Sequence, residues 1–88
     1  MYKITNVTDR EGNVKQEFID EMKSVHPNLS GDILYPELTK VGGHFCFVWN
    51  DDTDKILRSS TIEEYKNNDD TVKVVTRNSI YYLEKENN

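Results

Sequence analysis

The residues with the greatest potential for metal chemistry lie at positions 50–54, where three aspartates follow an asparagine. Calcium loops place oxygen ligands at alternate positions, then need a glycine at the sixth position and a glutamate at the twelfth. Counted from Asn50, those two positions hold Lys55 and Thr61. The stretch therefore predicts a solvated hairpin turn and no metal ion.

His44 and Cys46 form a second pair of interest, because alternation along a strand puts both side chains on one face. A metal ion needs more ligands than these, and the only other histidine, His26, directly precedes Pro27. An unpaired cysteine packs as a small hydrophobe more often than it acts as a nucleophile. The sequence also holds no phosphate-binding glycine loop and no HExxH motif. We therefore predict no catalysis, no cofactor and no metal.

Aromatic residues fill the same stretch, and alternation sends Phe45, Phe47 and Trp49 to one face of a strand. Both faces are more apolar than a half-exposed sheet requires. In the favoured interpretation the core takes one face and a helix covers the other. The alternative leaves Trp49 exposed, as an aromatic anchor with charged neighbours. It predicts a partner-binding surface that consists of Trp49, Asp51, Asp52, Asp54, Glu63, Glu64, Asp69 and Asp70.

The elements that must position these residues are predicted from periodicity. Residues 2–8 alternate as a strand, and the polar segment 9–13 is typical of a turn. A helix follows, with Asn13 as its cap and Pro27 as its stop. Its apolar stripe is expected to consist of Val14, Phe18, Met22 and Val25.

From residue 32 the pattern favours strands. We expect strand segments at 33–35 and 38–41 around Pro36, a strand at 44–49, its partner at 55–60, and a short helical turn at 62–65. A two-residue turn at positions 77–78 would set Val74 opposite Tyr81 and Val72 opposite Leu83. The predicted fold is α+β, a small and strongly curved antiparallel sheet or SH3-like barrel with one N-terminal amphipathic helix.

Length and charge limit the remaining choices. The 88 residues suit a single domain, 1–88, and its net charge is -5. Its lysines and arginines are interleaved with acids along the sequence, so we expect no direct nucleic-acid binding. No apolar stretch predicts a membrane span or a signal peptide, which favours the cytoplasm.

One resemblance concerns residues 41–84. It rests on the Trp-containing strand followed by residues 58–62 (RSSTI), on residues 72–76, and on the ending TRNSIYYLE at 76–84. This half of the chain resembles small uncharacterised proteins encoded by phages and mobile elements of Gram-positive bacteria. The resemblance implies a compact β domain acting inside a bacterial host cell, in a setting where small acidic proteins often block host defence.

Three functions therefore remain open. The first is a non-catalytic inhibitor that binds a host defence protein stoichiometrically, with a basic surface of that protein as the candidate docking site. The second is a homo-oligomeric sponge for a nucleotide immune signal, which would need Arg58 and Arg77 to converge on phosphate. The third is a small structural or accessory phage protein.

Overall fold

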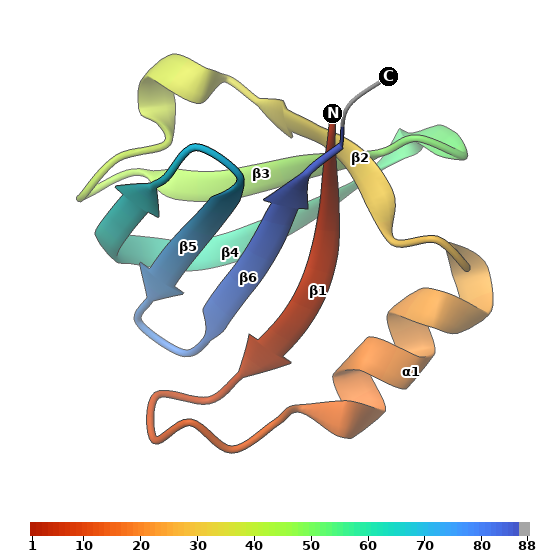
Figure 1. Cartoon of the computed structure of the whole chain (residues 1–88), viewed down its shortest axis with the longest axis horizontal. Helices are drawn as coiled ribbons and strands as arrows, with labels where there is room; N and C mark the ends of the chain where they lie inside the picture. The colour runs from red at the N-terminus through yellow and green to blue at the C-terminus, as the bar shows by residue number, and fades with distance from the viewer. Residues whose placement is uncertain (87–88) are drawn as a thin grey trace.

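Six antiparallel strands and one α-helix make up the computed structural model, which describes residues 1–86 (Figure 1). The elements in chain order are β1 (Tyr2–Thr8), α1 (Gln16–Val25), β2 (Ser30–Leu34), the 3-10 turn η1 (Pro36–Leu38), β3 (His44–Trp49), β4 (Asp52–Asn67), β5 (Thr71–Thr76) and β6 (Ile80–Lys85). Each strand pairs with the next along the chain, and β6 pairs with β1, so the sheet closes into a barrel. The predicted antiparallel sheet with an N-terminal helix is confirmed.

The barrel interior is filled by one face of β3 and by the last hairpin. Phe45 and Phe47 are fully buried, and the ring of Phe45 lies 5.2 Å from that of Tyr81. The predicted hairpin register is confirmed, because Val72 pairs with Leu83 and Val74 with Tyr81. A backbone hydrogen bond from Thr76 to Ser79 closes the two-residue turn between them. Strand alternation alone thus selects most of the core.

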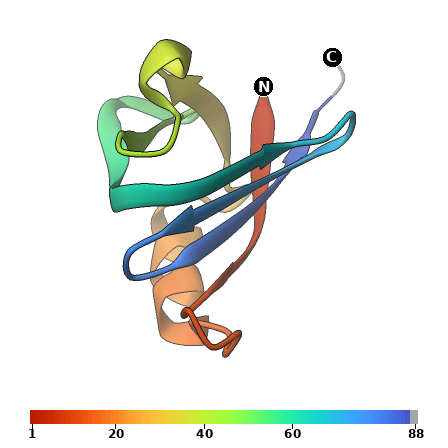
Figure 2. The ribbon, with the colours of Figure 1, turned by 90° about the vertical axis from the view of Figure 1, so that its left-hand side faces the viewer.

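Helix α1 connects β1 to β2 and buries Ile19 and Met22 in the barrel core (Figure 2). The predicted stripe was wrong at both ends, since Val14 and Val25 are exposed. Asn13 does not cap the helix. Its backbone N–H and its side-chain amide both donate to the Asp9 carboxylate, which organises the preceding turn and delays the helix until Gln16.

The helix also does not cover the second face of β3, as the favoured interpretation expected. Ile19 and Met22 join the same core as Phe45 and Phe47. The outward-facing side of β3 therefore remains partly accessible to solvent, at His44 and at Cys46 alike.

The predicted strand at 38–41 was wrong, and β2 ends at Leu34. Tyr35 takes a left-handed conformation with φ 52°, and Pro36 then begins η1. Proline suits the first position of a helical turn because its fixed φ is already helical and it has no N–H to satisfy. Figure 2 shows η1 and α1 at opposite ends of the molecule.

Strand β4 continues through the predicted helical turn at 62–65, which was also wrong. Ile62 pairs with Thr76 and Tyr65 with Val74, so pairing with β5 overrides the local capping pattern. Within residues 1–86, no helix is long and apolar enough to cross a membrane.

Close approach of β2 to β3 depends on a missing side chain. A Cβ atom at Gly31 would overlap the carbonyl oxygen of Val48 and the ring of Phe47. We expect Gly31→Ala to lower the free energy of unfolding by roughly 1–3 kcal/mol, measured by denaturant titration. Asp32→Ala, at the next and exposed position, is the control; it removes only an exposed ion pair with the N-terminal ammonium group and should change the free energy of unfolding by less than about 1 kcal/mol. Equal effects of both substitutions would contradict this packing.

Tyr81 gives the fold a dependence on alkaline pH. Burial raises the pKa of its phenol above the usual 10.0, although the hydrogen bond with Ser79 acts in the opposite direction. The phenol therefore ionises more readily in the unfolded chain. The contribution of the neutral Tyr81 phenol to the free energy of unfolding is therefore present below about pH 10 and is lost as the pH rises further.

We expect Tyr81→Phe to remove this contribution, so that the variant loses less stability than the native protein between about pH 9 and pH 11. Denaturant titrations across this range measure the difference. Tyr35→Phe is the matched control, because the Tyr35 side chain is exposed. A Tyr81 variant with the same pH dependence as the native protein would refute this role.

Candidate functional site

Trp49 is 4% exposed, so the exposed aromatic anchor considered from the sequence was wrong. The ring of His26, at the C-terminus of α1, stacks on the indole with centroids 4.1 Å apart and an interplanar angle of 8°. Phe47 meets the indole edge-on at 5.3 Å. Trp49 therefore joins the core to the end of the helix.

Asp51 holds this stack in place. Its Oδ1 lies 2.6 Å from Nδ1 of His26. A carboxylate only accepts hydrogen bonds, so Nδ1 of His26 is the donor. The role of Asp51 seen in the structure is thus to orient a buried ring, whereas its carboxylate is still half-exposed.

The other predicted acidic residues do not form one surface. Asp52 and Asp54 begin β4, Glu63 pairs with Arg10, and Glu64 lies 3.1 Å from Lys66. Asp69 and Asp70 lie in the turn between β4 and β5. A strand advances about 3.3 Å per residue, so the ends of β4 are far apart along the chain. Figure 1 shows the β3–β4 turn and the β4–β5 turn at different ends of the barrel.

An unpaired strand edge is the most distinctive feature of β4. Asp52 pairs with Trp49 of β3, and residues 56–58 pair with Val48, Phe47 and Cys46, while a register shift leaves residues 53–55 between them without a partner on β3. Pairing with β5 begins only at Ile62. Within residues 1–86, no strand pairs with the other side of residues 52–58. Unpaired backbone groups of this kind can pair with a further strand.

A groove lies between this open edge and α1. It encloses about 400 Å³ and is lined by Phe18, Glu21, Met22, Val25, His26, Trp49, Lys55, Ile56 and Leu57. Phe18 also lines a neighbouring hollow of about 330 Å³, together with Lys15, Arg58, Ser59, Ser60, Asn78, Ser79 and Tyr81. We refer to the two hollows together as the α1–β4 groove.

The walls of the α1–β4 groove are largely apolar in its first half, and its second half is lined mostly by polar residues. Val25 is 62% exposed and Ile56 is 55% exposed, so the apolar half is accessible to a ligand. In the polar half, Nζ of Lys15 donates to Oγ of Ser79 at 2.7 Å and to the carbonyl oxygen of Asn78 at 3.2 Å. Arg58 lines the same half and is exposed.

Ile56 also borders a further hollow, on the outer face of β3. This hollow encloses about 500 Å³ and is lined by Tyr35, Leu38, Gly43, His44, Cys46, Ile56 and Arg58. Its apolar residues favour contact with another apolar surface. Within residues 1–86, no three His, Cys, Asp or Glu side chains lie close enough to hold a metal ion.

Sequence reasoning missed Val25, Ile56 and Tyr35 as surface residues. One signal was available, because Ile56 and Leu57 are adjacent in a strand and must point to opposite faces. The chain matches no protein-family model, no curated protein and no solved structure. Function is therefore inferred from the geometry of these surfaces.

The hydrogen bond between Asp51 and His26 is open to a direct test. Asp51→Ala leaves the buried Nδ1 donor without its acceptor, so we expect the free energy of unfolding to fall by about 1–2 kcal/mol. Denaturant titration followed by the fluorescence of Trp49 measures it, since the chain has one tryptophan. Asp54→Ala is the control at an exposed position of the same turn region. The assignment fails if the two variants lose the same stability.

Proposed function

We propose that this protein is a non-catalytic binding module that holds an extended segment of a partner protein in the α1–β4 groove. The segment would add a strand to the open edge of β4. The observation that supports this function is the unpaired edge at residues 52–58 with an accessible, largely apolar groove beside it. Strand addition uses main-chain hydrogen bonds for affinity and pockets for alternate side chains for specificity.

The dimensions of the groove suit a short segment. The ten residues of α1 span about 15 Å. An extended peptide covers that length with four or five residues at about 3.3 Å each. Alternate side chains of such a peptide would point toward Phe18 and Ile56, and the remaining ones would point into solvent.

Charge complementarity indicates the kind of segment. Three cationic side chains, Lys15, Lys55 and Arg58, line the α1–β4 groove, against one glutamate, Glu21. We therefore infer a segment with apolar residues for the first half and an acidic residue for the half near Lys15 and Arg58. The sequence predicted a partner with a basic surface. The acidic residues that were expected to bind such a surface lie in separate groups, so we infer this different kind of partner.

Two finer predictions belong to the same proposal. An SH3-like barrel is supported by the closed ring of strand pairings and by β4, which pairs with β3 in its first half and with β5 in its second. A phage or mobile-element inhibitor of a host protein, acting in the bacterial cytoplasm, is supported by the resemblance of residues 41–84. A stoichiometric inhibitor needs a docking surface of this kind and no catalytic group.

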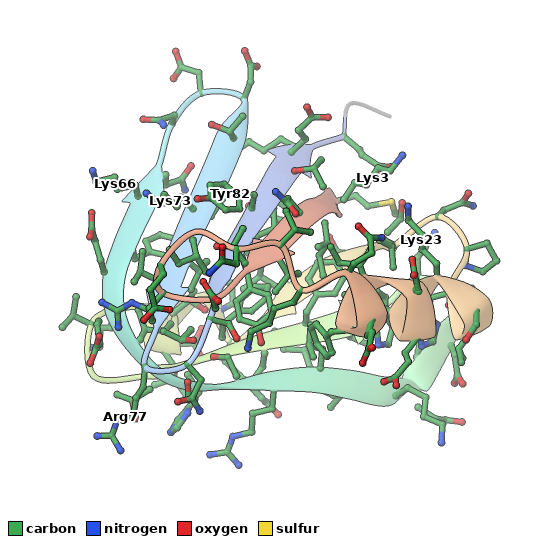
Figure 3. The ribbon with its side chains drawn as sticks, turned by 90° about the horizontal axis from the view of Figure 1, so that it is seen from below. Lys3, Lys23, Lys66, Lys73, Arg77 and Tyr82 are labelled. Carbon is green, nitrogen blue, oxygen red and sulfur yellow. The ribbon has the colours of Figure 1, made fainter. Side chains whose placement is uncertain are left out.

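The nucleotide sponge has less support than the peptide-binding module. It needs Arg58 and Arg77 to converge, and Arg58 lines the α1–β4 groove. Figure 3 shows Arg77 projecting outward from the β5–β6 turn.

Selection from a displayed library of short peptides, followed by calorimetry on the best sequences, tests the proposal. We expect Ile56→Asp to weaken binding by at least about tenfold, since it places a charge in the apolar half of the groove. Val41→Asp is the matched control, because Val41 is a 66% exposed apolar residue that lines neither half of the groove. Binding that tolerates Ile56→Asp, or a selection without binders, would overturn the proposal.

Strand addition also requires hydrogen bonds from the backbone of the bound peptide. In an added strand, only alternate peptide N–H groups face the edge of β4. N-methylation at those positions should abolish binding, whereas N-methylation at the intervening positions should be tolerated. Equal sensitivity at every position would contradict a strand geometry.

A further inference from the structure

Two lysines face each other on the outside of the barrel, at some distance along the sheet from the open edge. Lys66 on β4 pairs with Lys73 on β5, and Lys73 pairs with Tyr82 on β6. The three side chains form a row across three neighbouring strands, as Figure 3 shows. Like charges directly opposite each other in a sheet are destabilising. The fold itself therefore gains nothing from this arrangement.

Local partners offset only part of that repulsion. Nζ of Lys66 lies 3.1 Å from the carboxylate of Glu64, and both side chains are about half-exposed. Nζ of Lys73 lies 5.8 Å from the centre of the Tyr82 ring, which suits a cation–π contact. Exposed pairs of this kind contribute little to stability, so both ammonium groups remain available to an anionic ligand.

The row continues toward two further lysines. Tyr82 pairs with Asn6 on β1, and Lys3 lies earlier on the same strand. Lys3 and Lys23 of α1 line one hollow of about 340 Å³ together with Asn6. We call Lys66, Lys73, Tyr82, Lys3 and Lys23 the cationic track (Figure 3).

Acidic residues beside the cationic track are fewer than its lysines. Glu64 pairs with Lys66, and Glu84 is the β6 residue opposite Lys3. Asp20 lies three residues before Lys23 on α1, so four ammonium groups stand against three carboxylates, and this surface is locally positive on a chain of net charge -5. None of the residues of the cationic track lines the α1–β4 groove, so the two surfaces are separate.

We propose that the cationic track binds the backbone of a single-stranded nucleic acid, with Tyr82 as a stacking platform for a base. Proteins that hold single strands combine a positively charged surface with aromatic side chains on which bases stack. Neighbouring strands are about 4.8 Å apart, so the track from β4 to β1 covers about 15 Å, the reach of a few nucleotides. Lys73 moves from the ring of Tyr82 to a phosphate, and the ring becomes free for the base.

This proposal reverses the expectation that the protein does not bind nucleic acid directly. That expectation rested on lysines interleaved with acids along the sequence. In a sheet, the neighbours of a side chain are set by cross-strand pairing and not by sequence order. Lys66 and Lys73 are therefore adjacent across the sheet although polar and acidic residues separate them along the chain.

Fluorescence anisotropy with a labelled oligothymidylate of about 12 nucleotides tests the proposal. With three phosphates neutralised, the logarithm of the association constant should fall with the logarithm of salt concentration with a slope of about -2. Between about 50 and 200 mM salt, the affinity should fall about 20-fold. A duplex of the same length should bind more weakly, since its bases are not free to stack on Tyr82.

Matched variants locate the site. The double substitution Lys66→Glu with Lys73→Glu should abolish binding at low salt, whereas Lys40→Glu with Arg77→Glu makes the same charge change at exposed positions outside the cationic track and the α1–β4 groove and should retain most of it. Tyr82→Phe should bind like the native protein, and Tyr82→Leu should bind several-fold more weakly at unchanged salt slope.

Several results would overturn the proposal. They are no binding at low salt, equal loss in the two double variants, equal affinity for the duplex, or equal affinity for a polyglutamate peptide. Circular dichroism on each variant shows that the fold is retained. Binding of peptides in the α1–β4 groove is measured separately, so either proposal can fail without the other.

Discussion

Closure of the sheet depends on β4 exchanging one neighbour for another partway along its length. Its first half pairs with β3, and its second half pairs with β5 from Ile62 onward. Ser59 and Ile62 mark the exchange. The N–H of Phe45 donates to Oγ of Ser59 at 3.0 Å, and Ile62 forms backbone hydrogen bonds with Gly42 and Gly43. Register shifts on both sides of this point allow one strand to bend around the core.

The unpaired edge of β4 follows directly from this exchange. A strand has two edges, and the first half of β4 uses only the one that faces β3. Helix α1 lies beside the other edge but supplies no backbone groups to it, because helical N–H and C=O groups bond within the helix. Closing the barrel around one core thus creates a surface with unsatisfied main-chain groups next to apolar side chains. The architecture and the proposed binding surface have the same origin.

The sequence predicted those parts of the fold that alternation or turn chemistry determines locally. The first strand, the turn after it, the strand at 44–49 and the register of the last hairpin were all predicted correctly. The errors fell where a contact with a residue far away in the sequence determines the local structure. Tyr65 has the local features of a short helix but pairs with Val74, and Asn13 is bound by Asp9 instead of capping α1.

The candidate surfaces were harder to predict for the same reason. The burial of Trp49 depends on His26, which is far away in the sequence and arrives only when α1 docks. The pairing of Lys66 with Lys73 depends on the register between β4 and β5, which no local pattern shows. Composition indicated an acidic protein, and folding disperses the predicted acidic residues while it sets Lys66 opposite Lys73.

The open edge also affects how the protein behaves in a crowded solution. A bare strand edge can template pairing with a second molecule, and proteins limit this hazard with charged side chains along the edge. Asp52, Asp54, Lys55 and Arg58 place such charges on this segment of β4, on either side of Ile56. Charges of both signs repel an identical strand in some registers and attract it in others. The mixed charges along this edge therefore restrict the registers in which a second copy of the strand can pair with it.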